Sequence, residues 1–506
     1  MAVTALPRSE PRSETGPADR QRALAGFFAA ETGAEAVDIS RIALLAGGAI
    51  QENWAIDAEF AGGRLAGPQR LVLRCDAATG VASSLDRVAE FAVLRAVFAA
   101  GVAVPEPLFA CADNAVLGKP FFVMRRVAGS AAGRPITLDP ALEAARPAIA
   151  AQVGRELARL QTVRPPRRDL AFLRPYDGPQ ESIAGFRAYL DAHPSPRPVL
   201  EWALRWAEAH WPEPLAPVLC HRDFRTGNYL LQGTTLTAIL DWEFAGWGDP
   251  DEDIGWFCCK GWRFGRLDRA AGGIADRADF YRGYEAESGR RLDPERVRFW
   301  EVYANIRWAI IALQQSDRFL LGGARNLSTA ITGRRATECE LELMMLLDAD
   351  GPPTATLGSG PRQALPDDEG AGEGVGMRDL PATRDLLALA HELLLDELAP
   401  LLPAERRRDA HLVATVMGMV AREAAGEGWP EAVARALAAF YSAGEGQTPL
   451  LRRLAADLRN GAFETSPSRE AAARAILWRL TSEKLREGNP QFLAANRLGN
   501  AGGRDR

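Results

Sequence analysis

The segment His221–Asn228 (HRDFRTGN) holds the residues whose types and spacing most clearly suggest chemistry. Phosphoryl transfer needs nucleotide phosphates held in place, Mg²⁺ bound by oxygen atoms, and an acceptor hydroxyl beside a carboxylate. Asp223 can orient or deprotonate such a hydroxyl, while oxygen atoms of Asn228 and Asp241 are suitable ligands for one or two Mg²⁺ ions. These residues therefore predict phosphoryl transfer that depends on ATP and Mg²⁺.

Two further residues of the segment fit this chemistry. We expect His221 to brace the loop backbone, and Arg225 to reach the transferring γ-phosphoryl group and neutralise its developing charge. The alternative is that the HRD triplet occurs by chance and that Asp241 only caps a helix. The longer pattern, HxDxxxxN followed 13 residues later by Asp241, is more restrictive and favours the functional interpretation.

Short apolar runs must position these side chains. Residues 218–220 and 229–231 flank the loop and are typical of strands, so Asp223 and Asn228 can face one cavity. Residues 238–240 form a third apolar run, which predicts a buried strand that brings Asp241 to the same place.

The stretch from His221 to Gly255 resembles the signature of the aminoglycoside phosphotransferase and choline kinase-like family. Its pattern H-x-D-x-x-x-x-N, then D-W-E, then G-D-P-x-x-D is met at every defining position. The resemblance implies Asp223 as catalytic base and Asn228 and Asp241 as Mg²⁺ ligands. It also implies that Asp249 and Asp253 brace the loop, although both could equally favour the start of a helix.

The first third of the chain predicts a small lobe of five antiparallel strands. A short helix is expected over 20–32 and an amphipathic helix over 84–100. Short apolar or alternating runs predict the strands, at residues 42–45, 54–60, 70–75, 108–111 and 121–127. The fold class is therefore α+β, with a two-lobed protein-kinase-like arrangement.

A kinase-like small lobe also requires a cation that reaches the phosphates from the third strand, steadied by a helix carboxylate. No lysine precedes Lys119, so elimination leaves Arg74, in the run LVLR. This run resembles the corresponding strand of kinase-like domains fused to acyl-CoA dehydrogenases, where arginine replaces lysine. Glu90, 16 residues later on the expected helix, is the best partner for Arg74; a solvent-facing glutamate is the alternative.

Three further features could contact the nucleotide. Gly47-Gly48 followed by Asn53 resembles the glycine turn of this family, although a plain hairpin turn is the alternative. Met124 could pack near adenine, and the backbone around Arg126 could hydrogen-bond it. As hydrophobic core, however, this strand needs no ligand.

The remaining chain is helical, interrupted by one Gly-, Pro- and acid-rich stretch at 349–376 that predicts a linker. About five amphipathic helices follow it, and they resemble an uncharacterised helical extension seen beside such phosphotransferases in bacteria. The expected organisation is a disordered tail (1–19), a kinase-like small lobe (20–128), a helical lobe (129–348), the linker, a separate all-α domain (377–492) and a second disordered tail (493–506).

Composition limits the partners. The net charge is −6, with 60 basic and 66 acidic residues spread along the chain, so no nucleic-acid partner is expected. No apolar run of 18 residues and no signal peptide appear, which predicts a cytoplasmic protein without a membrane partner. The six cysteines and five histidines show no zinc-binding pattern.

Two classes of function remain open. One is a kinase that moves the γ-phosphoryl of ATP to a hydroxyl of a small molecule, with a hydroxyacyl-CoA as one candidate acceptor and choline-like amines or aminoglycosides as alternatives. The other is a nucleotide-binding pseudokinase whose C-terminal domain binds partners, against which the intact Asp223, Asn228 and Asp241 argue. The C-terminal domain could cap the acceptor pocket, form a homodimer or dock a neighbouring enzyme.

Overall fold

The structure of the chain is a computed structural model. It describes residues 17–45, 51–77, 84–321, 327–348, 350–352, 383–425, 429–442 and 447–496. The glycine pair Gly47-Gly48 and both expected tails, apart from residues 17–19 and 493–496, lie outside this part of the chain. Most of the expected linker lies outside it as well.

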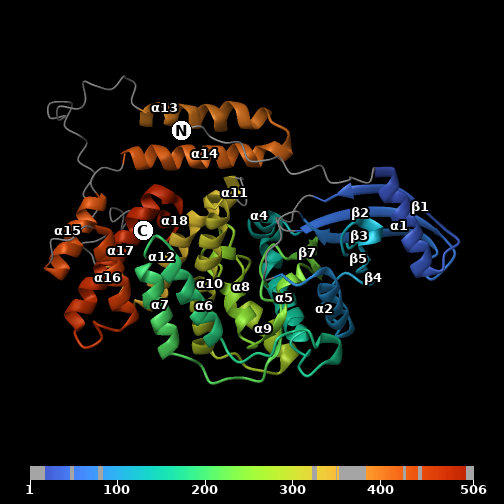
Figure 1. Cartoon of the computed structure of the whole chain (residues 1–506), viewed down its shortest axis with the longest axis horizontal. Coiled ribbons are helices and arrows are strands. Elements are labelled where there is room, and N and C mark those ends of the chain that lie inside the picture. Colours follow the sequence, from blue (N-terminus) through green and yellow to red (C-terminus); the bar gives the residue numbers. More distant parts are fainter. Residues whose placement is uncertain are drawn as a thin grey trace. The chain divides into compact units, whose positions relative to one another are not determined.

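The chain divides into two compact units, each built from segments that are distant in sequence (Figure 1). The first comprises residues 1–176, 216–250 and 278–290, and the second comprises residues 177–215, 251–277 and 291–506. All residues predicted to bind ATP or Mg²⁺, or to act on the acceptor hydroxyl, belong to the first unit.

A five-stranded antiparallel sheet dominates the start of the first unit, as the sequence predicts. Its strand order is β1-β2-β3-β5-β4. The strands are β1 (Ala36–Leu44), β2 (Gln51–Ala61), β3 (Gly67–Asp76), β4 (Pro107–Cys111) and β5 (Phe121–Arg125). The expected turn at residues 117–118 is instead one helical turn, α3 (Asn114–Leu117), which ends where Gly118 adopts a left-handed conformation with φ of 75°.

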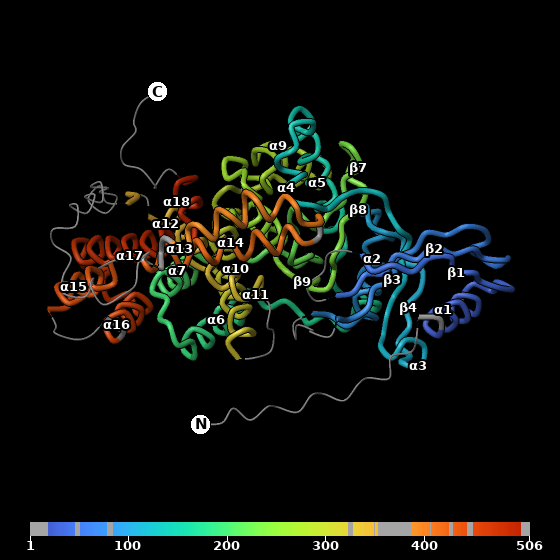
Figure 2. The backbone as a smooth tube through the Cα atoms, turned by 90° about the horizontal axis from the view of Figure 1, so that it is seen from above, coloured from blue at the N-terminus to red at the C-terminus, as the bar shows by residue number. Residues whose placement is uncertain are grey.

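Alternation along the strands separates an apolar face of the sheet from a polar one. Ile56, Leu71 and Leu73 join the core together with Phe28 from helix α1 (Pro17–Thr32), which covers this face (Figure 2). Residues at the intervening positions, including Arg74, point to the opposite face, because successive side chains of a strand alternate. The sheet thus buries one face and offers the other to the site.

Helix α2 (Arg87–Ala99) follows β3 and packs on β4 and β5. Its first turn is capped by Asp86, whose carboxylate accepts a hydrogen bond of 2.8 Å from the backbone N of Ala89. The cap fixes where the helix starts, and therefore where Glu90, in the first turn, is presented.

The rest of the first unit consists of short elements and two helices that pack closely. Added Cβ atoms at Gly154 and Gly283 would lie 2.3 Å from the carbonyl oxygen of Phe280 and 2.0 Å from that of Ala151, so only glycine permits this approach. The elements are α4 (Gly133–Leu138), α5 (Arg146–Leu160), β6 (Val218–Cys220), β7 (Tyr229–Gln232), β8 (Thr235–Ile239), β9 (Gly246–Gly248), α9 (Arg277–Ser288) and the 3-10 helices Pro140–Ala145, Arg168–Leu170 and Trp242–Phe244.

The second unit is helical. Its first part contains α6 (Gln180–Ala192), α7 (Pro198–Ala209), α8 (Glu252–Cys258), α10 (Pro294–Leu320), α11 (Leu327–Thr332), α12 (Ala336–Leu347) and 3-10 helices at Lys260–Trp262 and Gly333–Arg335. The later part contains α13 (Thr383–Glu392), α14 (Ala404–Ala425), α15 (Trp429–Tyr441), α16 (Gln447–Arg459), α17 (Pro467–Gly488), α18 (Pro490–Ala495), a π-helix at Leu393–Leu398 and a 3-10 helix at Ala399–Leu401.

The C-terminal helices share this compact unit with α7. Helix α16 packs on α7, where Arg459 Nη2 lies 2.6 Å from Glu201 Oε1 and Arg205 Nε lies 2.6 Å from Glu464 Oε1. The predicted boundary at residue 377 stays a prediction, because residues 353–382 are outside the described part.

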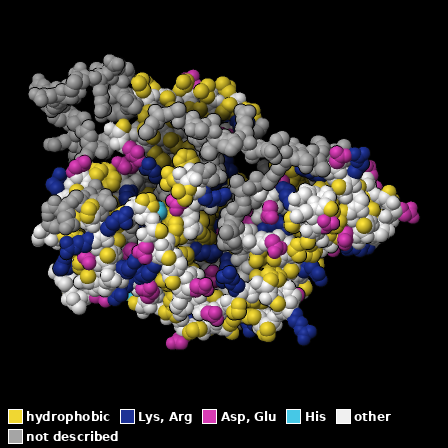
Figure 3. Space-filling view, in the orientation of Figure 1, with side chains coloured by type: hydrophobic (Ala, Val, Ile, Leu, Met, Phe, Trp, Pro, Cys, Tyr) yellow, Lys and Arg dark blue, Asp and Glu magenta, His cyan; other side chains and the backbone are white. Residues whose placement is uncertain are grey.

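Basic and acidic side chains are interspersed on the face of the molecule in view in Figure 3. Among the described residues, no helix is both long enough and apolar enough to cross a membrane.

Candidate active site

The loop after β6 is tied to the end of β8 through His221. The fully buried imidazole lies with Nε2 2.8 Å from the carbonyl oxygen of Leu240, and its Nδ1 accepts a hydrogen bond of 3.2 Å from the backbone N of Asp223. Burial lowers the pKa of His221, and the two contacts suit a neutral ring that donates from Nε2. His221 thus fixes the backbone on both sides of the cluster.

Two residues of the site adopt a backbone conformation that side chains rarely take. Arg222 has φ of 63° and Asp241 has φ of 64°. The left-handed region costs free energy for residues with a Cβ, and such residues concentrate at functional sites. Arg222 is held by a 2.7 Å hydrogen bond from Nη2 to the carbonyl oxygen of Trp247 in β9.

Asp223 and Asn228 lie in direct contact. Asn228 Nδ2 donates to the Asp223 carboxylate at 2.7 Å and to its carbonyl oxygen at 2.9 Å. Arg225 Nε donates to both carboxylate oxygens of Asp223, at 3.0 and 3.1 Å. Because the amide nitrogen of Asn228 faces Asp223, its carbonyl oxygen is the atom suited to a metal.

The end of β8 brings Asp241 beside this pair. The backbone N of Leu240 donates to the carbonyl oxygen of Asn228 at 2.8 Å, so the two segments run side by side. Partial burial raises the pKa of Asp241, but the charges of Arg74 and Arg225 outweigh that effect and hold the pKa below its ordinary value. Asp241 is therefore a carboxylate at neutral pH.

Arg74 and Glu90, joined in the sequence only by inference, form an ion pair. Arg74 Nε lies 3.1 Å from Glu90 Oε1, and Arg74 Nη1 lies 2.8 Å from Asp241 Oδ1 and 3.4 Å from Asn53 Oδ1. Burial alone lowers the pKa of Arg74, but the charges of Glu90 and Asp241 outweigh it and raise the pKa. Arg74 thus links the sheet, helix α2 and the predicted metal-binding carboxylate.

Sequence reasoning missed two charged residues of this cluster. Glu243 Oε2 accepts hydrogen bonds from Gln51 Nε2 at 2.6 Å and from Ser84 Oγ at 3.1 Å, and it lies 3.8 Å from Arg74 Nη2. Arg87, fully buried, pairs with Glu90 and lies 3.9 Å from Glu243 Oε2. The glutamate of the D-W-E motif and the i, i+3 spacing of Arg87 and Glu90 were the available signals.

The residues expected near adenine lie on β5 and just beyond it. Met124 is opposite Val72 of β3, and neighbouring Phe122 is opposite Arg74. The backbone N–H groups of Arg125 and Arg126 donate to the carbonyl oxygens of Glu106 and Arg70, both at 2.9 Å. These two N–H groups are therefore engaged within the sheet, and an adenine contact there would use other backbone groups.

The oxygen donors present suit a hard cation. Asn228 contributes an amide carbonyl and Asp241 a carboxylate, which are ligands that Mg²⁺ accepts, with nucleotide phosphates completing the coordination. The described residues hold no group of three or more His, Cys, Asp or Glu side chains arranged to bind a metal. Asp253, the last acid of the motif, lies buried in the first turn of α8.

Together, the sheet and the cluster define a kinase-like phosphotransferase. The sequence profile of the phosphotransferase enzyme family matches residues 41–300, which is more than half of the 506 residues. The chain belongs to this family. A second profile, a domain of unknown function (DUF6285), matches residues 400–492, within the C-terminal helices.

Curated relatives match the first part of the chain. Acyl-CoA dehydrogenase family member 10 of Mus musculus is 28% identical over 300 residues, which cover 55% of this chain and 27% of the relative. Acyl-CoA dehydrogenase family member 11 of Gallus gallus is 31% identical over 180 residues, 34% of this chain and 22% of the relative. The matched region therefore spans about a quarter of these relatives.

A solved structure supports the fold. A Ralstonia eutropha protein classed among the aminoglycoside phosphotransferases superposes with a TM-score of 0.51 at 22% identity, covering 63% of this chain and 95% of that chain. The expected kinase-like architecture is confirmed by this similarity and by the antiparallel sheet.

Proposed function

We propose that this chain transfers the γ-phosphoryl group of ATP to a hydroxyl group of a small molecule, with Mg²⁺ bound at Asn228 and Asp241. One observation carries the proposal. Within a single compact unit, the hydrogen-bonded pair Asp223–Asn228 adjoins Asp241, which in turn contacts Arg74. Phosphoryl transfer needs these groups and little else from the protein.

The proposed step is a displacement at the γ-phosphorus. Asp223 accepts the proton of the acceptor hydroxyl as its oxygen bonds to phosphorus, while the bond from phosphorus to the β,γ-bridging oxygen breaks and releases ADP. Arg225, held 3.0 Å from Asp223, neutralises charge on the transferring group. Bound Mg²⁺ neutralises negative charge on the phosphates.

The acceptor is proposed from the relatives. Two of them are named after acyl-CoA dehydrogenases, so a hydroxyacyl-CoA is the first acceptor to test. Aminoglycosides and choline-like amines are the alternatives within the same class of reaction. A screen that measures Mg²⁺-dependent ADP release with each class of acceptor separates them.

The central test is Asp223→Asn. Loss of the base should reduce kcat by about 10²- to 10⁴-fold while nucleotide affinity stays near that of the wild type. Asp268→Asn, which removes an exposed carboxylate, is the matched control and should leave ADP release unchanged. Wild-type turnover by Asp223→Asn would reject the proposed mechanism. Nucleotide binding without ADP release for every acceptor would favour the pseudokinase alternative.

A further inference from the structure

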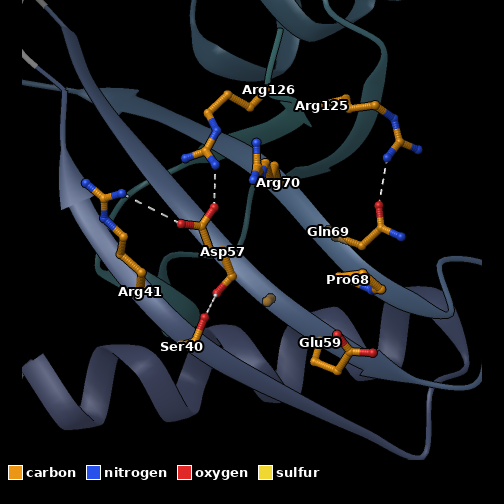
Figure 4. A pocket seen from close by; sticks show the side chains of 10 residues that line it. Ser40, Arg41, Asp57, Glu59, Pro68, Gln69, Arg70, Arg125 and Arg126 are labelled. Carbon is orange, nitrogen blue, oxygen red and sulfur yellow. Dashed lines mark hydrogen bonds and ion pairs between the residues drawn. The ribbon is translucent and has the colours of Figure 1, made fainter. Parts of the chain in front are cut away.

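A pocket of about 970 Å³ lies on the sheet away from Arg74 and has no role in the proposed reaction. Four arginines line it, with Asp57 and Glu59 as its only carboxylates. The arginines come from three strands and the residue after β5, and they are Arg41, Arg70, Arg125 and Arg126. Figure 4 shows these side chains around the open surface of the sheet.

Asp57 holds two of the arginines toward the pocket. Its carboxylate pairs with Arg126 and lies 3.9 Å from Arg41 Nη1, and these two arginines reach it from different sides (Figure 4). One carboxylate thus fixes two guanidinium groups and neutralises only one of their charges. Backbone hydrogen bonding adds rigidity, because Ser40 Oγ donates to the Asp57 carbonyl oxygen at 3.1 Å.

The other two arginines differ in their partners. Arg125 Nε lies 2.6 Å from Glu106 Oε2, and its Nη1 donates to Gln69 Oε1 at 2.7 Å. Arg70 is directly opposite Asp57 in the register of β2 and β3, yet no hydrogen bond or ion pair of its side chain is found among the described residues. Arg70 is therefore the cation that is free to receive a ligand.

The charge of the pocket selects the ligand. Four guanidinium groups against two carboxylates leave a net positive charge in the lining, which suits phosphate oxygens, since guanidinium groups bind phosphate through two parallel hydrogen bonds. A neutral base such as adenine would prefer apolar walls. Arg70 lies four residues before Arg74 on the same face of β3, a separation of about 13 Å.

We propose that this pocket is a second anion site, which binds a phosphate or diphosphate group of a small molecule other than the ATP phosphates at Arg74. Two sources share this chemistry: the phosphates of a coenzyme A derivative, and a second nucleotide. The site is independent of the chemical step, because none of its four arginines contacts Asp223, Asn228 or Asp241 among the printed contacts of the described residues.

Calorimetry with pyrophosphate tests the proposal on the full chain. The protein is first saturated with Mg²⁺ and a non-hydrolysable ATP analogue, whose own affinity is measured, so that the phosphate site at Arg74 is filled. Arg70→Glu should then weaken pyrophosphate binding at least about tenfold, because it removes a charged hydrogen-bond donor and adds a repelling charge. Arg41→Gln, which keeps the strand residue polar, should weaken it in the same direction.

Arg22→Glu is the matched control. It makes the same charge change on α1, whose helix packs on the opposite face of the sheet, and should leave pyrophosphate affinity within about twofold. Coenzyme A, 3′-dephospho-coenzyme A and excess ATP then identify the source by competition with pyrophosphate. The proposal is overturned if the saturated wild type binds no pyrophosphate or if Arg70→Glu binds it equally well. It is also overturned if Arg70→Glu weakens the ATP analogue by the same factor.

Discussion

Buried charge is handled differently in the two compact units. Around Arg74, in the first unit, one guanidinium group meets three carboxylates, those of Glu90, Asp241 and Glu243. In α17 of the second unit, Lys484 has only one nearby carboxylate, Glu340, and also meets the positive charge of Arg197. The first cluster is balanced in favour of anions, whereas the second leaves a cation poorly compensated.

The contrast separates charges that a site requires from charges that a fold tolerates. Burial raises the pKa of Glu90, and the charges of Arg74 and Arg87 only partly offset it, so the acid depends on both arginines for its ionised form. Burial, with a smaller contribution from Arg197, lowers the pKa of Lys484 to about 8. Three substitutions test this difference, and each is followed by urea unfolding.

The largest effect is expected for Arg74→Met. It leaves Glu90 and Glu243 in a buried site without their shared partner, which should lower the free energy of unfolding by about 3–5 kcal/mol and abolish nucleotide binding. The double variant Arg74→Met/Glu90→Gln should recover part of the stability but none of the binding. A loss below about 1 kcal/mol for the single variant would show that the cluster is not a coupled network.

An opposite sign is expected for Lys484→Met. The unfolded pKa lies near 10.5 and the folded pKa near 8, so the unfolded state binds more protons between these values and wild-type stability should rise with pH across that window. The methionine variant should lack this rise and be more stable by about 1–3 kcal/mol at pH 7. A flat wild-type profile from pH 8 to 10 would contradict the depressed pKa.

The smallest effect is expected for Arg205→Ala. Its partner Glu464 is 60% exposed, and Arg205 itself is 36% exposed, so water competes with the ion pair. The loss should be at most about 1 kcal/mol and should shrink further in 1 M salt. A loss comparable with that of Arg74→Met would mean that α7 and α16 depend on this pair.

Local spacing made much of the site predictable. Asp223 and Asn228 lie in one loop, and a short strand carries Asp241 back beside them, so the contacts follow from a segment of about twenty residues. The pairing of Arg74 with Glu90 followed from the absence of lysine in the first 118 residues. The predicted strands and helices agree with the structure because their apolar periodicity is strong.

Contacts between distant segments were not predictable from the sequence. Gln51 and Glu243 are 192 residues apart and meet only because the sheet and the D-W-E turn share one compact unit. The left-handed backbone at Asp241 is likewise imposed by its surroundings and carries no glycine or asparagine signal. Side-chain identity gave the chemistry, and long-range packing decided which charges share it.

The ion pair between Arg74 and Asp241 has a thermodynamic consequence for ligand binding. As long as the 2.8 Å contact exists, each residue occupies the counter-charge position that a phosphate or a metal ion would otherwise fill. A phosphate that draws Arg74 away leaves Asp241 in need of a cation, and a cation at Asp241 releases Arg74 for a phosphate. The two ligands should therefore promote each other's binding to the same degree, as reciprocal coupling requires.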